Sequence, residues 1–141
     1  MIGINRRGLL LGAFASGIVM NVLDGLTNGI LFVNEFRANS IRLGLDPAAA
    51  ESSLGIVTWV SLDFLFGLVL VWLYAAMRPT YGAGPLTALR AAAAVYLPTT
   101  GIILGFGVLG ILTGSLLVKM SISGAIVLAA GALVGWWFYR E

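Results

Sequence analysis

The sequence predicts an all-α integral membrane protein, a bundle of four antiparallel transmembrane helices with both termini in the cytoplasm. The first observation is composition: 60% of the 141 residues are hydrophobic and only 10% are charged, whereas a soluble domain has about 25% charged residues. The second is length, because a span needs about 20 apolar residues. Four segments of the single domain 1–141 meet that need: residues 8–33, 54–77, 87–115 and 118–138.

The composition also excludes several classes of function. The chain has no cysteine and no histidine, so disulfides, thiolate chemistry and imidazole metal ligands are excluded. No basic run exceeds Arg6-Arg7, which excludes nucleic acid as a partner. The expected partner is the lipid bilayer, with a larger membrane complex or a homo-oligomer left open. The sequence identifies no cofactor and shows no metal-ligand spacing.

The first segment begins like an export signal. NRRGLLLGAFASG contains a twin arginine, and Ala13-Phe14-Ala15 has the form of a cleavage site. The apolar run continues to about Val33, however, which is too long for a signal and right for a span. We therefore expect a retained first helix.

Turn signals separate the later helices. Residues 34–52 form a polar loop in which Asp46-Pro47 favours a helix start. Pro79 is expected to end the second helix, and Pro85 to open the third. The last connection is predicted at Gly114-Ser115.

Within the third helix, Pro98 predicts a kink. It removes one backbone hydrogen bond, and the hydroxyl of Thr99 or Thr100 is placed to satisfy the freed carbonyl.

The basic residues predict the orientation, because cytoplasmic loops of membrane proteins carry an excess of Lys and Arg. Five basic residues fall at the end of the bundle that holds the termini, and three fall at the other end. The five are Arg6, Arg7, Arg78, Arg90 and Arg140, and the three are Arg37, Arg42 and Lys119.

Polar residues interrupt the first span in the stretch NVLDGLTNG. At 100° per residue, Asn21, Asp24 and Asn28 fall on one face of the helix. Asp63 lies in the second span at about the same depth as Asp24, given a rise of about 1.5 Å per residue. We expect the two carboxyl groups to meet and to share a proton, because an unpaired charge in the bilayer is costly.

Two interpretations of this polar cluster stay open. Intramembrane polar residues often act only as hydrogen-bonding glue between helices, with Ser61 as a further donor. Alternatively, the cluster is a site for a proton, a small cation or a polar ligand. Tyr96 and Thr100 would complete such a site if the third helix packs against the first, whereas Trp59 is expected to anchor the membrane interface.

Two segments resemble a group of small four-span bacterial membrane proteins of unknown function: NVLDGLTNGILF in the first span and LDFLFGLVLVWLYAAMRPTYGAGPLTALRA at residues 62–91. An Asp on each of the first two helices and a cytoplasmic turn R-P-x-[YF]-G-x-G-P recur in that group. Here they correspond to Asp24, Asp63 and residues 78–85. The resemblance implies a four-helix architecture and the bacterial inner membrane, and it implies no activity.

These observations favour a non-enzymatic structural or accessory subunit. The alternative is a small proton- or cation-coupled transporter or channel that uses Asp24 and Asp63. The two hypotheses differ in one expectation: a transporter has both acids facing a cavity, whereas an accessory protein buries them in a closed contact.

Overall fold

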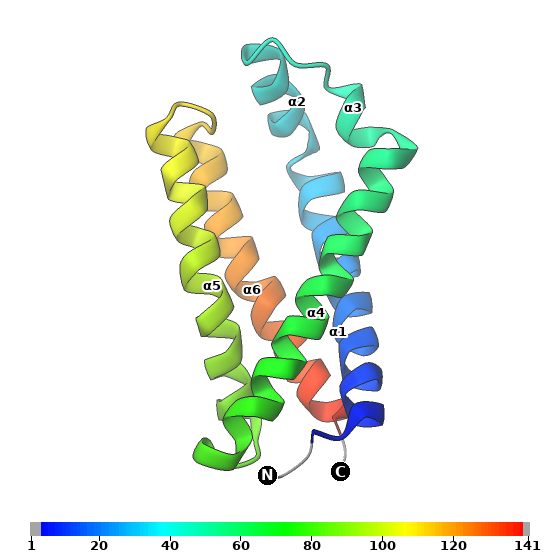
Figure 1. Cartoon of the computed structure of the whole chain (residues 1–141). Helices are drawn as coiled ribbons and strands as arrows, with labels where there is room; N and C mark the ends of the chain where they lie inside the picture. Colours follow the sequence, from blue (N-terminus) through cyan, green and yellow to red (C-terminus); the bar gives the residue numbers. More distant parts are fainter. Residues whose placement is uncertain (1–3, 140–141) are drawn as a thin grey trace.

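A computed structural model of the chain describes residues 4–139, and every regular element in that range is helical (Figure 1). Four spans are long and apolar enough to cross a membrane, so this is a multi-pass membrane protein and the predicted fold class is confirmed. The elements are α1 (Arg6–Leu26), the π-helix η1 (Thr27–Leu31), α2 (Val33–Arg42), α3 (Ala48–Glu51), α4 (Ser53–Tyr81), α5 (Pro85–Val108) and α6 (Gly114–Phe138).

The predicted loop after the first span is itself largely helical. α2 follows η1 almost directly, and its polar surface explains why a hydropathy argument assigned it to a loop. α3 begins where expected, with Asp46 Oδ1 accepting a hydrogen bond from the Ala48 N–H at 2.9 Å.

The prediction that Pro79 ends the second helix was wrong, since α4 continues through it to Tyr81. Pro79 removes the hydrogen bond that a backbone N–H would donate to the Ala75 carbonyl, and α4 continues for only two residues beyond it. The helix ends instead at Gly82, whose φ of 82° is left-handed and whose N–H donates to the Arg78 carbonyl at 2.9 Å. Pro85 opens α5 as expected.

The turn between the last two spans was placed too late. α5 ends at Val108, and the left-handed Gly110 (φ 72°) reverses the chain. Thr113 then caps α6, its hydroxyl accepting from the Leu116 N–H at 3.4 Å. A left-handed glycine is a common way to end a helix. Gly110 comes before the Gly114-Ser115 pair, from which the position of the turn was predicted.

The four spans form two pairs that converge at one end and diverge at the other (Figure 1). α1 packs against α4 and α6, and α5 packs against α6 and α4. The convergent end holds both termini. We call this end the terminal half, and it extends from the termini to the level of Met20, Gly67, Val95 and Val127. The divergent end carries α2, α3 and the α5–α6 turn, and we call it the loop half.

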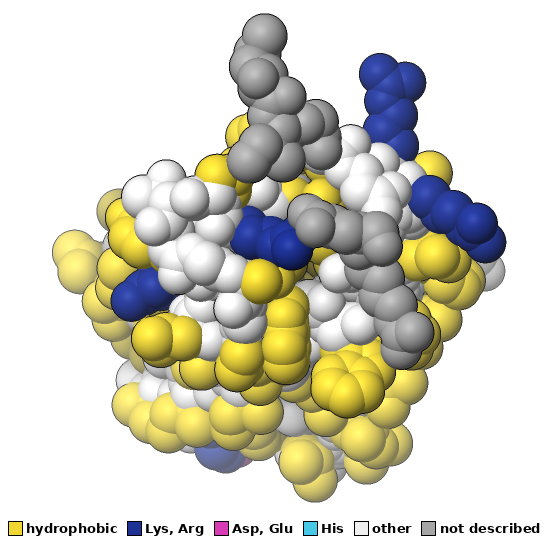
Figure 2. Space-filling view, turned by 90° about the horizontal axis from the view of Figure 1, so that it is seen from below, with side chains coloured by type: hydrophobic (Ala, Val, Ile, Leu, Met, Phe, Trp, Pro, Cys, Tyr) yellow, Lys and Arg dark blue, Asp and Glu magenta, His cyan; other side chains and the backbone are white. Residues whose placement is uncertain are grey.

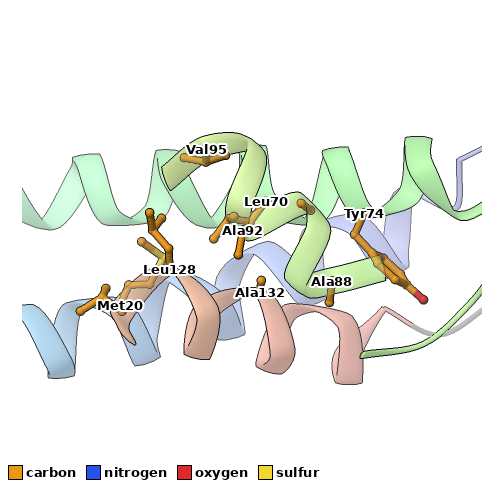
Figure 3. Close-up of a cluster of buried hydrophobic side chains, with 10 residues drawn as sticks. Met20, Leu70, Tyr74, Ala88, Ala92, Val95, Leu128 and Ala132 are labelled. Carbon is orange, nitrogen blue, oxygen red and sulfur yellow. The ribbon is translucent and has the colours of Figure 1, made fainter. Parts of the chain in front are cut away.

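The hydrophobic core lies in the terminal half (Figure 3). Alanines of α5 and α6 allow the helices to approach, and glycines bring backbones into contact. A Cβ built on Gly67 would lie 2.8 Å from both the Ala13 carbonyl oxygen and the Gly17 nitrogen. The buried core residues are Met20, Leu70, Tyr74, Ala88, Ala91, Ala92, Val95, Val127, Leu128 and Ala132.

Basic side chains are scattered over the end of the terminal half, among hydrophobic and uncharged groups (Figure 2). The exposed Arg6, Arg7 and Arg90 come from the start of α1 and of α5, and the partly exposed Arg78 from the end of α4. Arg140, the fifth basic residue assigned to this end, lies outside the described residues.

Candidate functional site

A cavity of about 230 Å³ lies directly beyond the core, between the α1–α4 pair and the α5–α6 pair. Met20, Val127 and Leu128 belong both to the core and to the cavity wall, so the core forms its floor. Its lining consists of Met20, Asp24, Asn28, Trp59, Leu62, Asp63, Phe66, Thr99, Ile103, Met120, Ser123, Gly124, Val127 and Leu128.

The two intramembrane acids meet at this cavity. The carboxyl groups of Asp24 on α1 and Asp63 on α4 lie within hydrogen-bonding reach of each other, and Asp63 is only 9% exposed. Asn28 adds a third polar group, with its Nδ2 donating to Asp24 Oδ1 at 3.2 Å. A hydrogen bond between two carboxyl groups requires a proton on one of them, so this geometry suits a pair that holds one proton.

A change of helix type places Asn28 at the site. The π-helix η1 starts at Thr27, three residues after Asp24, and the Thr27 hydroxyl donates to the Leu23 carbonyl at 2.9 Å. Such π-helical turns inside α-helices are rare and occur often at functional sites. The Oδ1 of Asn28 is buried and lacks a hydrogen-bond partner among the described residues.

Asn21 and Ser61 lie outside the cavity lining. The Asn21 amide donates to the Gly17 carbonyl at 2.9 Å and to the Val60 carbonyl at 3.3 Å, which ties α1 to α4. Ser61 is exposed and donates to the Val57 carbonyl of its own helix at 2.7 Å. Asn21 therefore joins two helices, and Ser61 satisfies its hydroxyl locally.

On α5, the polar residue that lines the cavity is Thr99 rather than Tyr96 or Thr100. The sequence predicted that Tyr96 and Thr100 would complete the site if the third helix packed against the first, but α5 packs mainly against α6 and α4. Tyr96 lies against the hydrophobic core. The Thr99 hydroxyl donates to the carbonyls of Val95 and Tyr96 at 2.9 and 3.0 Å, which are the two carbonyls that follow the Ala94 carbonyl left without its donor by Pro98.

Sequence reasoning missed much of the apolar wall. Trp59, expected at the membrane interface, is 61% exposed and also lines the cavity. Phe66, Met20 and Met120 contribute further to the wall. Their only sequence signal was hydrophobicity, which does not distinguish a cavity wall from a lipid-facing surface.

Polar contacts bridge the divergent pairs at the far end of the loop half. Glu35 on α2 pairs with Lys119 on α6 and accepts from the Ser115 hydroxyl at 3.0 Å. Asn39 and Arg42 donate to the Ile111 and Gly110 carbonyls of the α5–α6 turn at 3.0 and 2.9 Å. We call these contacts the loop clamp: Glu35, Asn39 and Arg42 with Gly110, Ile111, Ser115 and Lys119.

The loop clamp also affects the ionisation of Glu35. The hydrogen bond from Lys119 lowers the pKa of Glu35 below its ordinary value of 4.5, and the Ser115 hydroxyl lowers it further. The Glu35 carboxylate is therefore charged, and its partner Lys119 is occupied at neutral pH.

Comparison of the chain with protein-family models, with curated proteins and with solved structures gave no match. The geometry and chemistry of the cavity therefore carry the functional argument alone.

Proposed function

We propose that this protein is a small transporter of the bacterial inner membrane that moves a proton or a small cation through the Asp24–Asp63 pair. One observation carries the proposal: the two intramembrane acids meet at the wall of a cavity of about 230 Å³. Acidic residues inside membrane proteins commonly mark ion pathways and proton relays.

The cavity favours a transporter over an accessory subunit. Polar contacts that only hold helices together contribute about 0.6–2 kcal/mol each and need no open volume beside them. Here the acids adjoin an open volume with an apolar floor, and the helices diverge on its other side (Figure 1). This shape suits a carrier whose site is closed toward the termini by the core and bounded at the loop end by the loop clamp.

The basic terminal half supports a cytoplasmic position for both termini. Arg6, Arg7, Arg78 and Arg90 lie at that end, as the positive-inside rule requires. The loop half would then face the periplasm. Because the chain has no His or Cys, we propose a non-enzymatic function. We also propose that the protein self-associates, so that several copies together enclose a pathway.

The test is proton flux in proteoliposomes that contain a pH-sensitive dye and carry an imposed potassium diffusion potential. Wild type is expected to conduct protons, and Asp24→Asn to lose that flux while keeping its fold, because an amide replaces the hydrogen bonds of a protonated acid but cannot release a proton. Asp46→Asn is the matched control, since Asp46 lies in the exposed α2–α3 connection. Equal flux in wild type and Asp24→Asn would contradict the proposal.

A further inference from the structure

The cavity wall is polar on one side and apolar around the rest. Asp24, Asp63 and Asn28 form the polar side, with Thr99 and Ser123 as neutral additions. The apolar remainder includes two aromatic rings and two thioethers, contributed by Trp59, Phe66, Met20 and Met120. A ligand that matches this wall has one charged or hydrogen-bonding end and an apolar body.

The charge of the wall selects a cation. Both ionisable groups in the described lining are carboxyls, and the nearest basic groups are engaged elsewhere. Lys119 pairs with Glu35, and Arg42 donates to the Gly110 carbonyl. On the elements that pack around the pair, the arginines of α1, α4 and α5 lie at the opposite, terminal end of the bundle, and Glu35 and Lys119 neutralise each other. A positive ligand can therefore take the place of the proton on the acid pair, which leaves the net charge of the site unchanged.

The apolar wall disfavours a bare inorganic ion. Ca²⁺ takes six to eight oxygen ligands and Mg²⁺ requires an octahedron of them, and monovalent ions also need oxygens that replace their hydration shell. The described residues contain no group of three or more acidic side chains that could hold a metal ion. Trp59 and Phe66 instead contribute aromatic rings to the wall, and aromatic rings attract organic cations.

The volume and one buried oxygen specify the ligand further. An apolar cavity of about 150 Å³ holds benzene, so 230 Å³ suits a molecule of roughly ten non-hydrogen atoms. Asn28 Oδ1 is buried without a partner while its Nδ2 donates to Asp24. An acceptor in this position needs an N–H donor, which a primary ammonium carries and a quaternary ammonium lacks.

We propose that the cavity binds a small primary ammonium ion with an aromatic or alkyl body, which displaces the proton held by Asp24 and Asp63. This inference rests on the proposed transport function and names its substrate class. The ammonium group takes the place of the shared proton between the carboxylates, and the Asn28 amide turns so that its Oδ1 accepts one N–H. The released proton goes to the solution, so binding of each cation releases one proton.

Three probes of about ten non-hydrogen atoms each separate the elements of this proposal. The first is 3-phenylpropylammonium, with a charge and N–H donors. Phenyltrimethylammonium has the charge alone, and 3-phenylpropan-1-ol has the same body without charge. Binding is measured on the full chain in nanodiscs by calorimetry, together with proton release into weakly buffered solution.

The expected order of affinity is primary ammonium, then quaternary ammonium, then alcohol, with proton release only for the two cations. Asn28→Ala should weaken 3-phenylpropylammonium about tenfold or more and leave phenyltrimethylammonium unchanged, because only the first donates to the lost oxygen. Asp63→Asn should abolish proton release, and Asp46→Asn should behave as wild type.

Equal affinity for the ammonium and the alcohol would overturn the ligand class, and so would an equal loss for both cations in Asn28→Ala. These failures are distinct from failure of the proposed function. Binding with proton release but without transmembrane flux would retain the ligand and refute transport. Flux of protons without binding of either cation would retain transport and refute the ligand.

Discussion

The two halves of the bundle use the same kinds of residues with opposite results. In the terminal half, glycines lie where helices meet: Cβ atoms on Gly67 or Gly135 would overlap neighbouring atoms at 2.8 and 2.5 Å. In the loop half, Gly25, Gly29 and Gly105 have no such neighbour within 4 Å, and the close approaches there lie beside the two connections, where Gly55 meets the backbone of α3 and Gly107 meets the Leu117 side chain. Glycines on a helix surface permit close packing, but such packing occurs only where a second helix lies against that surface.

The difference explains where a site can form. Close-packed helices leave no room for a ligand. Where the helices diverge there is room, and the polar side chains there need hydrogen-bond partners other than a closely packed neighbouring helix. The loop half does so with the Asp24–Asp63 contact, the Asn28 bond and the loop clamp. The terminal half thus forms a rigid floor, and polar contacts hold the loop half together.

The largest effect is expected from placing a methyl group in the closed contact. Gly67→Ala should destabilise the protein by about 1–3 kcal/mol or more, because its Cβ would meet backbone atoms of α1 that cannot rotate away. Unfolding in mixed micelles measures the change.

Gly101→Ala on α5 is the matched control. A Cβ there has no neighbour within 4 Å, and loss of backbone freedom in the unfolded chain should stabilise the variant by about 0.4–1 kcal/mol. The same substitution should therefore have opposite signs in the two halves. Equal destabilisation by Gly67→Ala and Gly101→Ala would show that the different helix spacing in the two halves does not determine the effect of the substitution.

The second effect concerns the acid pair in the loop half. Asp24→Leu should destabilise the fold by about 1–3 kcal/mol, since it leaves Asp63 and the Asn28 amide without their partner. Asp24→Asn should cost little, because an amide both donates and accepts. Unfolding curves of the two variants test this, and equal stability of Asp24→Leu and wild type would refute the contact.

How far the sequence predicted the structure differs between the two halves. The four spans followed from hydropathy alone, because a bilayer requires long apolar helices whatever packs beside them. The matched depth of Asp24 and Asp63 followed from helix rise and antiparallel pairing. These features depend on one helix, or on two neighbours in the chain.

Features that depend on several helices were not predictable. The π-helix that places Asn28 and the choice of Thr99 over Thr100 depend on backbone detail. The position of Trp59 at the cavity depends on the divergence of α4 from α5 and α6, which no local pattern encodes. The polar residues of α2 suggested a loop, and their contacts with the α5–α6 turn appeared only in three dimensions.

A third, smaller effect is expected from the loop clamp. Spin labels at Ala38 on α2 and Leu109 on the α5–α6 turn, both exposed, report the distance that the clamp restrains. Lys119→Gln should broaden this distance distribution, because it removes the ion pair with Glu35. Arg37→Gln is the control, since Arg37 pairs with Glu51 near α3, at 2.6 Å, and does not reach the turn. If only Arg37→Gln broadened the distribution, the Arg37–Glu51 pair would restrain the distance and the Lys119–Glu35 pair would not.

The smallest effect is the response of the same distance to pH. The pKa of Glu35 is lowered below 4.5 by Lys119 and Ser115, so the contribution of this ion pair is complete above pH 4.5 and is lost as the pH falls through the pKa of the folded state. The labelled wild type should keep a narrow distribution from pH 7 to 4.5 and broaden only below that range. Glu35→Gln should be broad at every pH, because it never carries the charge. Broadening of the wild type between pH 7 and 5 would mean that a different group controls the clamp, since Glu35 is still ionised there.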